Sequence, residues 1–325
     1  MNDDQMFQMS LLGPVMAFFI ALILSSIAAP FVMKLLYRLK SRQVVSQYVE
    51  EHQKKQGTPT MGGLIILAGA IPALLLILGV SDPFSLGLIF VIVGFALIGF
   101  LDDYLVPRFV PGKRGLDWLP KLGLQILVSG GAALIGQVSL WDGLLLIFLL
   151  LFFSNAFNFA DGMDGLAASL WIALTFGIWL TAFWLDVPGL MIVSVAILGG
   201  IVPFLVLNSY PARVFMGDVG SLPLGAVLGG CVWMMLAETT NTTFAGTPFL
   251  IIAVVLFSGV MILELIPPPL QILSVKLFKR RIFPMTPIHH AFEKAGIPET
   301  RIVWGFFLLQ LVLSLAAYGV LLLAF

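Results

Sequence analysis

The sequence predicts an all-α, polytopic integral membrane protein with about ten transmembrane helices. The first observation is composition: 60% of the 325 residues are hydrophobic, 10% are charged, and mean hydropathy is +1.06. A soluble domain carries about 25% charged residues, so a soluble globular class is excluded. The second is that apolar runs of about 20 residues, the length that crosses a bilayer, recur along the chain. The third is that the positive residues occur only between certain runs or at the adjoining ends of those runs.

We expect one transmembrane domain over residues 1–325, built from ten spans. Their expected bounds are 11–36, 61–79, 84–101, 118–137, 140–157, 166–185, 188–207, 221–237, 248–273 and 302–325. Pro267-Pro268-Pro269 should break the ninth span, because proline removes a helical donor and clashes with the preceding turn. The acidic first ten residues lack a basic start, so we expect no cleaved signal peptide. Cys231 is the only cysteine, which excludes an intrachain disulfide.

The positive charges predict the orientation. Ten spans put both termini on one side, and all 17 Lys and Arg residues lie in one set of alternating loops or at the adjoining span ends. These loops cover residues 37–60, 102–117, 158–165, 208–220 and 274–301. The opposite loops carry Asp82, Asp142, Asp186 and Glu238. The positive-inside rule therefore predicts that the basic loops are cytoplasmic and that both termini lie outside.

The polar stretch NAFNFADGMDG, residues 155–165, lies between two long apolar runs. Asn155, Asn158, Asp161 and Asp164 recur every three residues, so on a continuing helix they share one face. A polar stripe at the edge of an apolar span is costly unless it faces protein or water, which marks it as a candidate site. The alternative is a loop in which Asn, Asp and Gly supply turn and capping chemistry.

Two further motifs lie on the same predicted membrane face. KKQGTPTMGG, residues 54–63, joins lysines to Gly and Thr and could bind an anion, although a positive-inside anchor before a Gly-rich helix start is the alternative. The third span ends in Asp102-Asp103, where adjacent carboxylates favour a shared proton or a bound metal. A simple marker of the membrane boundary is the alternative for this pair.

The last two motifs follow the seventh and ninth spans. NSYPARVFMGDVGS, residues 208–221, places Asp218 at a helix start, where it could hold Mg²⁺ or simply cap the helix, and Phe215 could stack on a base. KRRIFPMTPIHHAFEKAG, residues 279–296, sets His289 and His290 beside basic residues. Neighbouring helical residues point about 100° apart, so the pair suits phosphate oxygens better than one metal. Histidines that merely line the membrane interface are the alternative.

Together these motifs gather five carboxylates, two histidines, several Asn residues and a basic rim at one membrane face. Phosphoryl transfer needs such groups, because its catalysis is mostly positioning and charge neutralisation. The chain has no soluble domain to carry a reaction. We therefore expect a site at the cytoplasmic membrane surface that joins a water-soluble phosphate donor to a lipid phosphate.

In this order, the motifs KKQGTPTMGG, LDDYL, NAFNFADGMDGLA, NSYPARVFMGDVGSLPLG and RIFPMTPIHHAFE resemble those of the phospho-N-acetylmuramoyl-pentapeptide transferases. That family belongs to the polyprenyl-phosphate N-acetylhexosamine-1-phosphate transferase superfamily, and the likeness covers nearly the whole chain. It implies transfer of phospho-MurNAc-pentapeptide from UDP-MurNAc-pentapeptide to undecaprenyl phosphate, giving lipid I and UMP. It also implies Mg²⁺ as cofactor, a homodimer, surrounding membrane lipid and a place in the bacterial plasma membrane. We expect no nucleic-acid partner.

The resemblance also implies roles for residues. Asp218 resembles the Mg²⁺ ligand, and Asp102 and Asp103 resemble the catalytic pair, in which one carboxylate deprotonates the lipid phosphate or, in an older view, acts as nucleophile. We favour the base, since a charged Asp would repel the diphosphate. His289 is expected to be catalytic as well. The implied substrate-binding residues, with Asn208 and Phe215 near the uridine, are Lys55, Thr60, Lys121, Asn155, Asn158, Asp161, Asp164, Asn208, Phe215 and His290.

Three departures from the family pattern are Ala291 in place of a third histidine, NFADGMDG in place of NLTDGLDG, and the triple proline. None touches the acidic residues, but they leave the fit to the pentapeptide and the lipid tail open. An alternative function within the same superfamily is that of a transferase that uses UDP-GlcNAc for teichoic acid or O-antigen linkage. A cation-coupled transporter would instead need carboxylates near the membrane midplane and an inverted repeat, which the sequence does not show. A scaffold role would leave the charged cluster unexplained.

Overall fold

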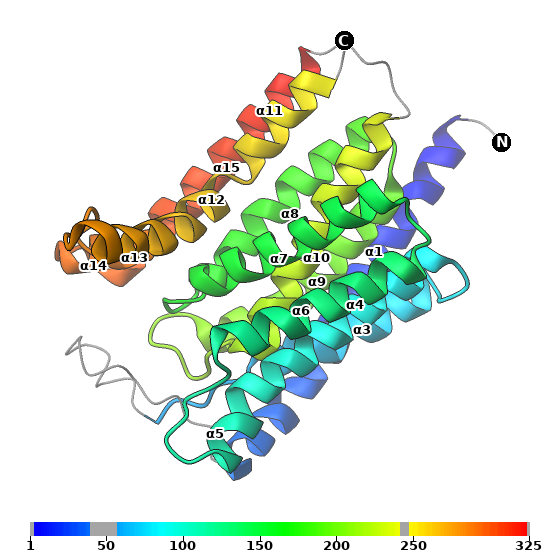
Figure 1. The fold of residues 1–325 in the computed structure, drawn as a ribbon. Coiled ribbons are helices and arrows are strands. Elements are labelled where there is room, and N and C mark those ends of the chain that lie inside the picture. The colour runs from blue at the N-terminus through cyan, green and yellow to red at the C-terminus, as the bar shows by residue number, and fades with distance from the viewer. Residues whose placement is uncertain (1–2, 40–56, 241–246, 324–325) are drawn as a thin grey trace.

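The computed structural model describes residues 3–39, 57–240 and 247–323, and every regular element within them is a helix. Figure 1 shows these helices as one elongated bundle. They are α1 (Asp3–Leu39), α3 (Gly63–Ile77), α4 (Pro83–Phe100), the π-helical turn η1 (Leu101–Leu105), α5 (Val106–Phe109), α6 (Trp118–Ile135), α7 (Leu140–Ala160), α8 (Leu166–Leu185), α9 (Pro188–Asn208), α10 (Asp218–Thr240), α11 (Thr247–Phe257), α12 (Gly259–Leu265), α13 (Pro267–Phe278), α14 (Ile288–Lys294) and α15 (Glu299–Leu322).

Nine helices in the described ranges are long and apolar enough to cross a membrane, which confirms the polytopic all-helical fold. The second predicted span is shorter than expected and is not one of these nine. Its helix, α3, has 15 residues, because Met61 is in a left-handed conformation at φ 72° and the helix begins only at Gly63.

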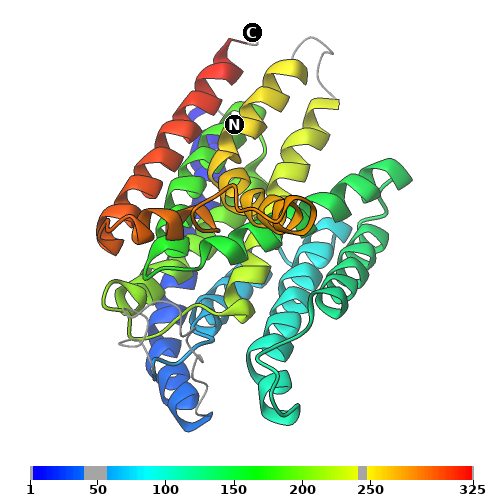
Figure 2. The same ribbon diagram turned by 60° about the vertical axis from the view of Figure 1, so that its left-hand side comes forward.

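The ninth predicted span is interrupted at the triple proline, as expected: α12 ends at Leu265 and α13 begins at Pro267. The sequence did not predict a second interruption at Ser258, between α11 and α12. Beyond the prolines, α13 points out of the bundle and is seen nearly end-on in Figure 2. Its apolar side chains, among them Leu277 and Phe278, are strongly exposed.

The described chain begins and ends at the same end of the bundle, where the start of α1 and the end of α15 lie (Figure 1). This agrees with the prediction that the two termini share one side of the membrane. The opposite end gathers the connections at residues 110–117, 161–165, 209–217 and 279–287. We call it the basic end, because most of the described Lys and Arg residues lie in these connections or at adjoining helix ends.

Helix α10 is packed closely against two neighbours through glycines. Gly225 and Gly229, four residues apart on one face, fit against the backbone of α7 at Phe153 and Leu149. Gly99 of α4 fits against the backbone of Asp218, the first residue of α10. Small residues at such spacing allow helix backbones to approach closely in a membrane, where van der Waals packing drives association. These contacts hold the start of α10 beside the end of α4.

We predict that Gly99→Ala destabilises the protein by about 1–3 kcal/mol, because the added methyl overlaps the Asp218 backbone and α4 and α10 must separate. Thermal unfolding in detergent measures the loss. Gly130→Ala in α6 is the matched control, since a methyl there meets no atom within 4 Å and alanine favours helix. Equal unfolding temperatures for the two variants would contradict the packing argument.

Candidate active site

Three carboxylates meet at the basic end of the bundle. Asp102 and Asp103 come from η1, and Asp218 begins α10. One oxygen from each lies within 4.8 Å of the other two, and together they could hold a metal ion. A set of carboxylate oxygens suits a hard divalent cation such as Mg²⁺ or Ca²⁺ better than a soft transition metal. The sequence predicted Asp218 as the metal ligand and left Asp102 and Asp103 open between a shared proton and a bound metal, and the structure places all three carboxylates where they could hold one ion.

The local structure explains how two adjacent aspartates reach one site. In η1 the N–H of Val106 bonds to the carbonyl of Leu101, which makes a π-helical turn, a feature frequent at functional sites. Asp103 Oδ2 accepts the Val219 N–H at 3.1 Å, and Asp102 Oδ1 accepts the Leu116 N–H at 2.8 Å. The capping role that the sequence offered for Asp218 therefore falls to Asp103, whose oxygen satisfies a free N–H in the first turn of α10.

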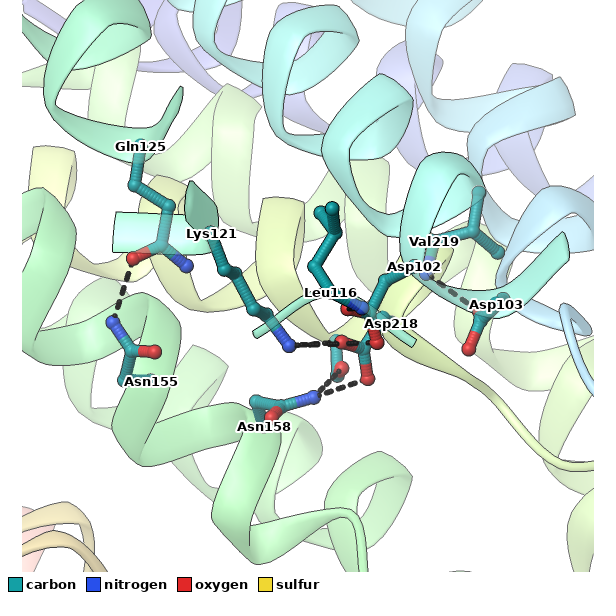
Figure 3. A network of polar contacts seen from close by, with 10 residues as sticks. Asp102, Asp103, Leu116, Lys121, Gln125, Asn155, Asn158, Asp218 and Val219 are labelled. Carbon is teal, nitrogen blue, oxygen red and sulfur yellow. Dashed lines mark hydrogen bonds and ion pairs between the residues drawn. The ribbon is translucent and has the colours of Figure 1, made fainter. Parts of the chain in front are cut away.

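Lys121 and Asn158 approach Asp218 from two sides (Figure 3). The Lys121 ammonium forms an ion pair with Asp218 and lies 3.7 Å from Asp102 Oδ2. Asn158 Nδ2 donates to Asp218 Oδ1 at 2.7 Å. Asn155 does not join this network, because its Nδ2 donates to Gln125 Oε1 at 2.9 Å (Figure 3). Of the two predicted stripe residues on α7, Asn158 therefore contacts the carboxylates, whereas Asn155 connects α7 to α6.

Asp161 extends the acidic site beyond the end of α7. Its carboxyl lies near the backbone N–H of Gly217, directly before Asp218. Burial raises the pKa of Asp161 well above its usual value, and the negative charges of Asp218 and Asp103 raise it further. Gly217 has φ +73°, and a Cβ there would lie 2.6 Å from Thr60 Oγ1. Thr60 therefore lies beside this loop, as the predicted site requires.

Asp164 and Asn208 hold two loops together. Asp164 Oδ2 accepts the Ala212 N–H at 2.9 Å. Asn208 Oδ1 accepts the Gly165 N–H at 3.0 Å, and its Nδ2 donates to the Val214 carbonyl at 2.9 Å. Both side chains are almost fully buried, so these contacts make them braces between the 161–165 and 209–217 connections.

Phe215 lies where the glycine-rich segment meets the loop before α10. Its N–H donates to the Pro59 carbonyl at 2.9 Å, and its carbonyl accepts the Gly62 N–H at 2.8 Å. The Phe215 side chain is half-buried. Lys55, the remaining predicted residue of this segment, lies outside the described residues.

The two histidines of α14 each have a glutamate partner, which the sequence did not predict. His289 Nδ1 lies 2.8 Å from Glu264 Oε2, and His290 Nδ1 lies 2.8 Å from Glu293 Oε2. The imidazole of His289 also packs against Gly162, so α14 touches the loop that carries Asp161. A signal for Glu264 was present, because it is the only charged residue in the ninth predicted span.

The comparisons with known proteins fit this arrangement. The sequence pattern of glycosyl transferase family 4 matches residues 85–237, and signature 1 of the phospho-N-acetylmuramoyl-pentapeptide transferases matches residues 55–67. A phospho-N-acetylmuramoyl-pentapeptide transferase of Moorella thermoacetica is 39% identical over 91% of this chain and 95% of its own length. The chain belongs to this transferase family. Transferases of the same name from Heliobacterium modesticaldum and Oceanobacillus iheyensis are 37% and 33% identical over 92% and 93% of the chain, and over 94% of their own length.

The two family matches cover different parts of the site. The family 4 match runs from α4 to α10 and contains Asp102, Asp103 and Asp218. The transferase signature contains Thr60 and the start of α3, the segment that lies beside Gly217. In this transferase the histidines and their glutamates lie beyond both matched ranges.

We predict that Asp161→Asn raises the thermal unfolding temperature in EDTA and that this gain grows as pH rises above about 4, the usual pKa of an aspartate. The raised pKa means that folded wild type retains a proton which the unfolded chain has lost, so its stability falls as pH rises toward that pKa. Asparagine has no proton to lose. A temperature difference that stays constant with pH would contradict the shift.

Asp82→Asn is the matched control, with the opposite sign. The N–H and hydroxyl of Ser85 lower the pKa of Asp82, so this carboxylate stabilises the folded protein above its usual pKa and the contribution disappears as pH falls. The control variant should therefore be less stable than wild type at neutral pH and approach it in acid.

Proposed function

We propose that this chain transfers phospho-MurNAc-pentapeptide from UDP-MurNAc-pentapeptide to undecaprenyl phosphate. The products are lipid I and UMP, and the reaction is the first membrane step of peptidoglycan synthesis. The observation that carries the proposal is the cluster of Asp102, Asp103 and Asp218 with Lys121 at the basic end. Membership of the transferase family over nearly the whole chain supports it.

We propose Mg²⁺ as the ion at this cluster, held by Asp218 with Asp102 and Asp103 beside it. The ion would neutralise charge on the diphosphate of the donor. Lys121 supplies a fixed positive charge next to Asp218 and Asp102. Asp102 and Asp103 each use one oxygen for a backbone N–H, which leaves the second oxygen of either to take the proton of the lipid phosphate. As a base a carboxylate suits this site better than as a nucleophile, because its charge repels a diphosphate.

The remaining predicted residues receive proposed roles from their positions. Asn158 orients Asp218, and Thr60, Asp161, Phe215 and His290 lie on segments that border the cluster. Asp164, Asn208 and Asn155 would act by holding the loops and helices around it. We assign Lys55 to the donor side from its motif alone.

The location follows from the charge pattern. We propose that the chain forms one domain in the bacterial plasma membrane, surrounded by lipid, with the basic end in the cytoplasm and both termini outside. A water-soluble nucleotide donor then reaches the cluster from the cytoplasm, and the lipid phosphate reaches it along the bilayer. We also propose a homodimer, as the family resemblance implies.

Purified protein with UDP-MurNAc-pentapeptide, undecaprenyl phosphate and Mg²⁺ should release UMP, and EDTA should abolish the release. Asp218→Asn should lower the rate by more than about 100-fold, because the variant loses a charge that faces the metal and Lys121. Asp117→Asn, an exposed aspartate at the same end, is the control and should keep the wild-type rate.

Competition between UDP-MurNAc-pentapeptide and UDP-GlcNAc separates the proposal from the alternative transferase of the same superfamily. Preferential use of UDP-GlcNAc would overturn the muramoyl assignment. Full activity in EDTA, or in Asp218→Asn, would overturn the metal role.

A further inference from the structure

A buried glutamate–histidine pair joins two helices behind the active site. Glu264 belongs to α12 and His289 to α14, and Glu264 Oε2 lies 2.8 Å from His289 Nδ1. Both side chains are fully buried. An ionisable side chain within a membrane-spanning helix is expensive and is a functional candidate by default.

The pair does more than join helices, because the Nε2 side of the His289 imidazole contacts the 161–165 loop of the candidate active site. The ring of His289 packs so closely on Gly162 that a Cβ at this position would overlap Nε2. Neither His289 Nε2 nor Glu264 Oε1 has a hydrogen-bond partner among the described residues. One edge of the ring is therefore held by Glu264, and the other faces the backbone next to Asp161.

The loop is in turn connected to the acidic cluster. Asp161 precedes Gly162, and its carboxyl lies near the backbone N–H of Gly217, directly before Asp218. On the other side of Gly162, the Asp164 N–H donates to Glu299 Oε1 of α15 at 2.7 Å. The carboxy-terminal helices thus hold this loop at two points, one through His289 and one through Glu299.

We propose that Glu264 is a positioning residue for the transferase reaction, an inference that rests on the proposed function. The carboxylate of Glu264 accepts the Nδ1–H of His289, which fixes the ring so that Nε2 faces the 161–165 loop. The fixed ring sets the position of this loop and, through it, the position of Asp161 beside Asp218.

Stability alone does not account for this pair. A buried ion pair is weak evidence for stability, because apolar side chains of similar volume often stabilise as well or better. The neighbouring pair His290–Glu293 has the same 2.8 Å separation, but it lies within one helix at i,i+3 and is partly exposed. Glu264 therefore differs from Glu293 in linking separate elements and in acting on the loop through His289.

A double-mutant cycle tests the linkage. Glu264→Gln should lower kcat for UMP release by about 10–100-fold and leave the KM of both substrates nearly unchanged. His289→Asn should lower kcat at least as much, and Glu264→Gln should add nothing in the His289→Asn background. Losses that multiply, a loss confined to KM, or wild-type kcat in Glu264→Gln would overturn the proposal.

Two further variants guard against an effect on folding. Glu264→Leu suits a membrane helix and should fold, yet it should be as slow as Glu264→Gln. Glu293→Gln, the matched change in the local pair, should lose much less activity. Equal losses in Glu264→Gln and Glu293→Gln would overturn the special role of Glu264.

Nitrogen NMR provides a readout that does not depend on activity. The chain has three histidines, so the variant His52→Gln/His290→Gln labelled with ¹⁵N-histidine reports His289 alone. We expect a protonated Nδ1 whose signal shifts when Glu264→Gln is added. A proton on Nε2 alone, or a spectrum that stays the same when Glu264→Gln is added, would overturn the proposed orientation of the His289 ring. A wild-type protein that releases no UMP but shows the expected spectrum would instead refute the proposed function.

Discussion

Asp102, Asp103 and Asp218 hold three carboxylates within 4.8 Å of one another, and the surrounding structure must offset their mutual repulsion. Ionised together, each pair would repel by roughly 3 kcal/mol at an effective dielectric constant of about 20. Lys121 supplies one positive charge, and backbone N–H groups of Leu116 and Val219 supply partial ones. These donors compensate for only part of the negative charge, so the cluster could hold a further cation.

The packing of α10 against its neighbours holds the three carboxylates together despite their repulsion. Mutually repelling groups would move apart unless their backbones were fixed, and glycines fix them here. Gly99 lets α4 touch the backbone of Asp218, while Gly225 and Gly229 set α7 against the next turns of α10. The polar network therefore depends on the close backbone packing of α10 against α4 and α7.

Much of this arrangement could be predicted from the sequence, because its signals are local. Apolar runs predict the helices, and the order of motifs places Asp102, Asp103, Asp161 and Asp218 at one end. The π-helical turn at 101–105 and the break at Ser258 could not be predicted, since both depend on packing against neighbouring helices rather than on residue type.

The hydrogen-bond partner of each polar side chain could not be predicted from the sequence either. Asn155 and Asn158 share one stripe, yet Asn155 meets Gln125 and Asn158 meets Asp218, because different helices face them. Glu264 was visible as an isolated charge in an apolar run, but only the fold shows that His289 lies opposite it. Sequence spacing fixes which residues share a face, and tertiary packing decides what that face meets.

The site is assembled from segments made at different times. Asp102, Asp103, Lys121 and Asp218 are all present once α10 has left the ribosome, whereas His289 and Glu299, which hold the 161–165 loop, are made only near the end of the chain. A nascent protein that has inserted its helices only as far as α10 would therefore contain the acidic cluster without the braces behind it. The 161–165 loop therefore gains its contacts with His289 and Glu299 only after the last spans have been made.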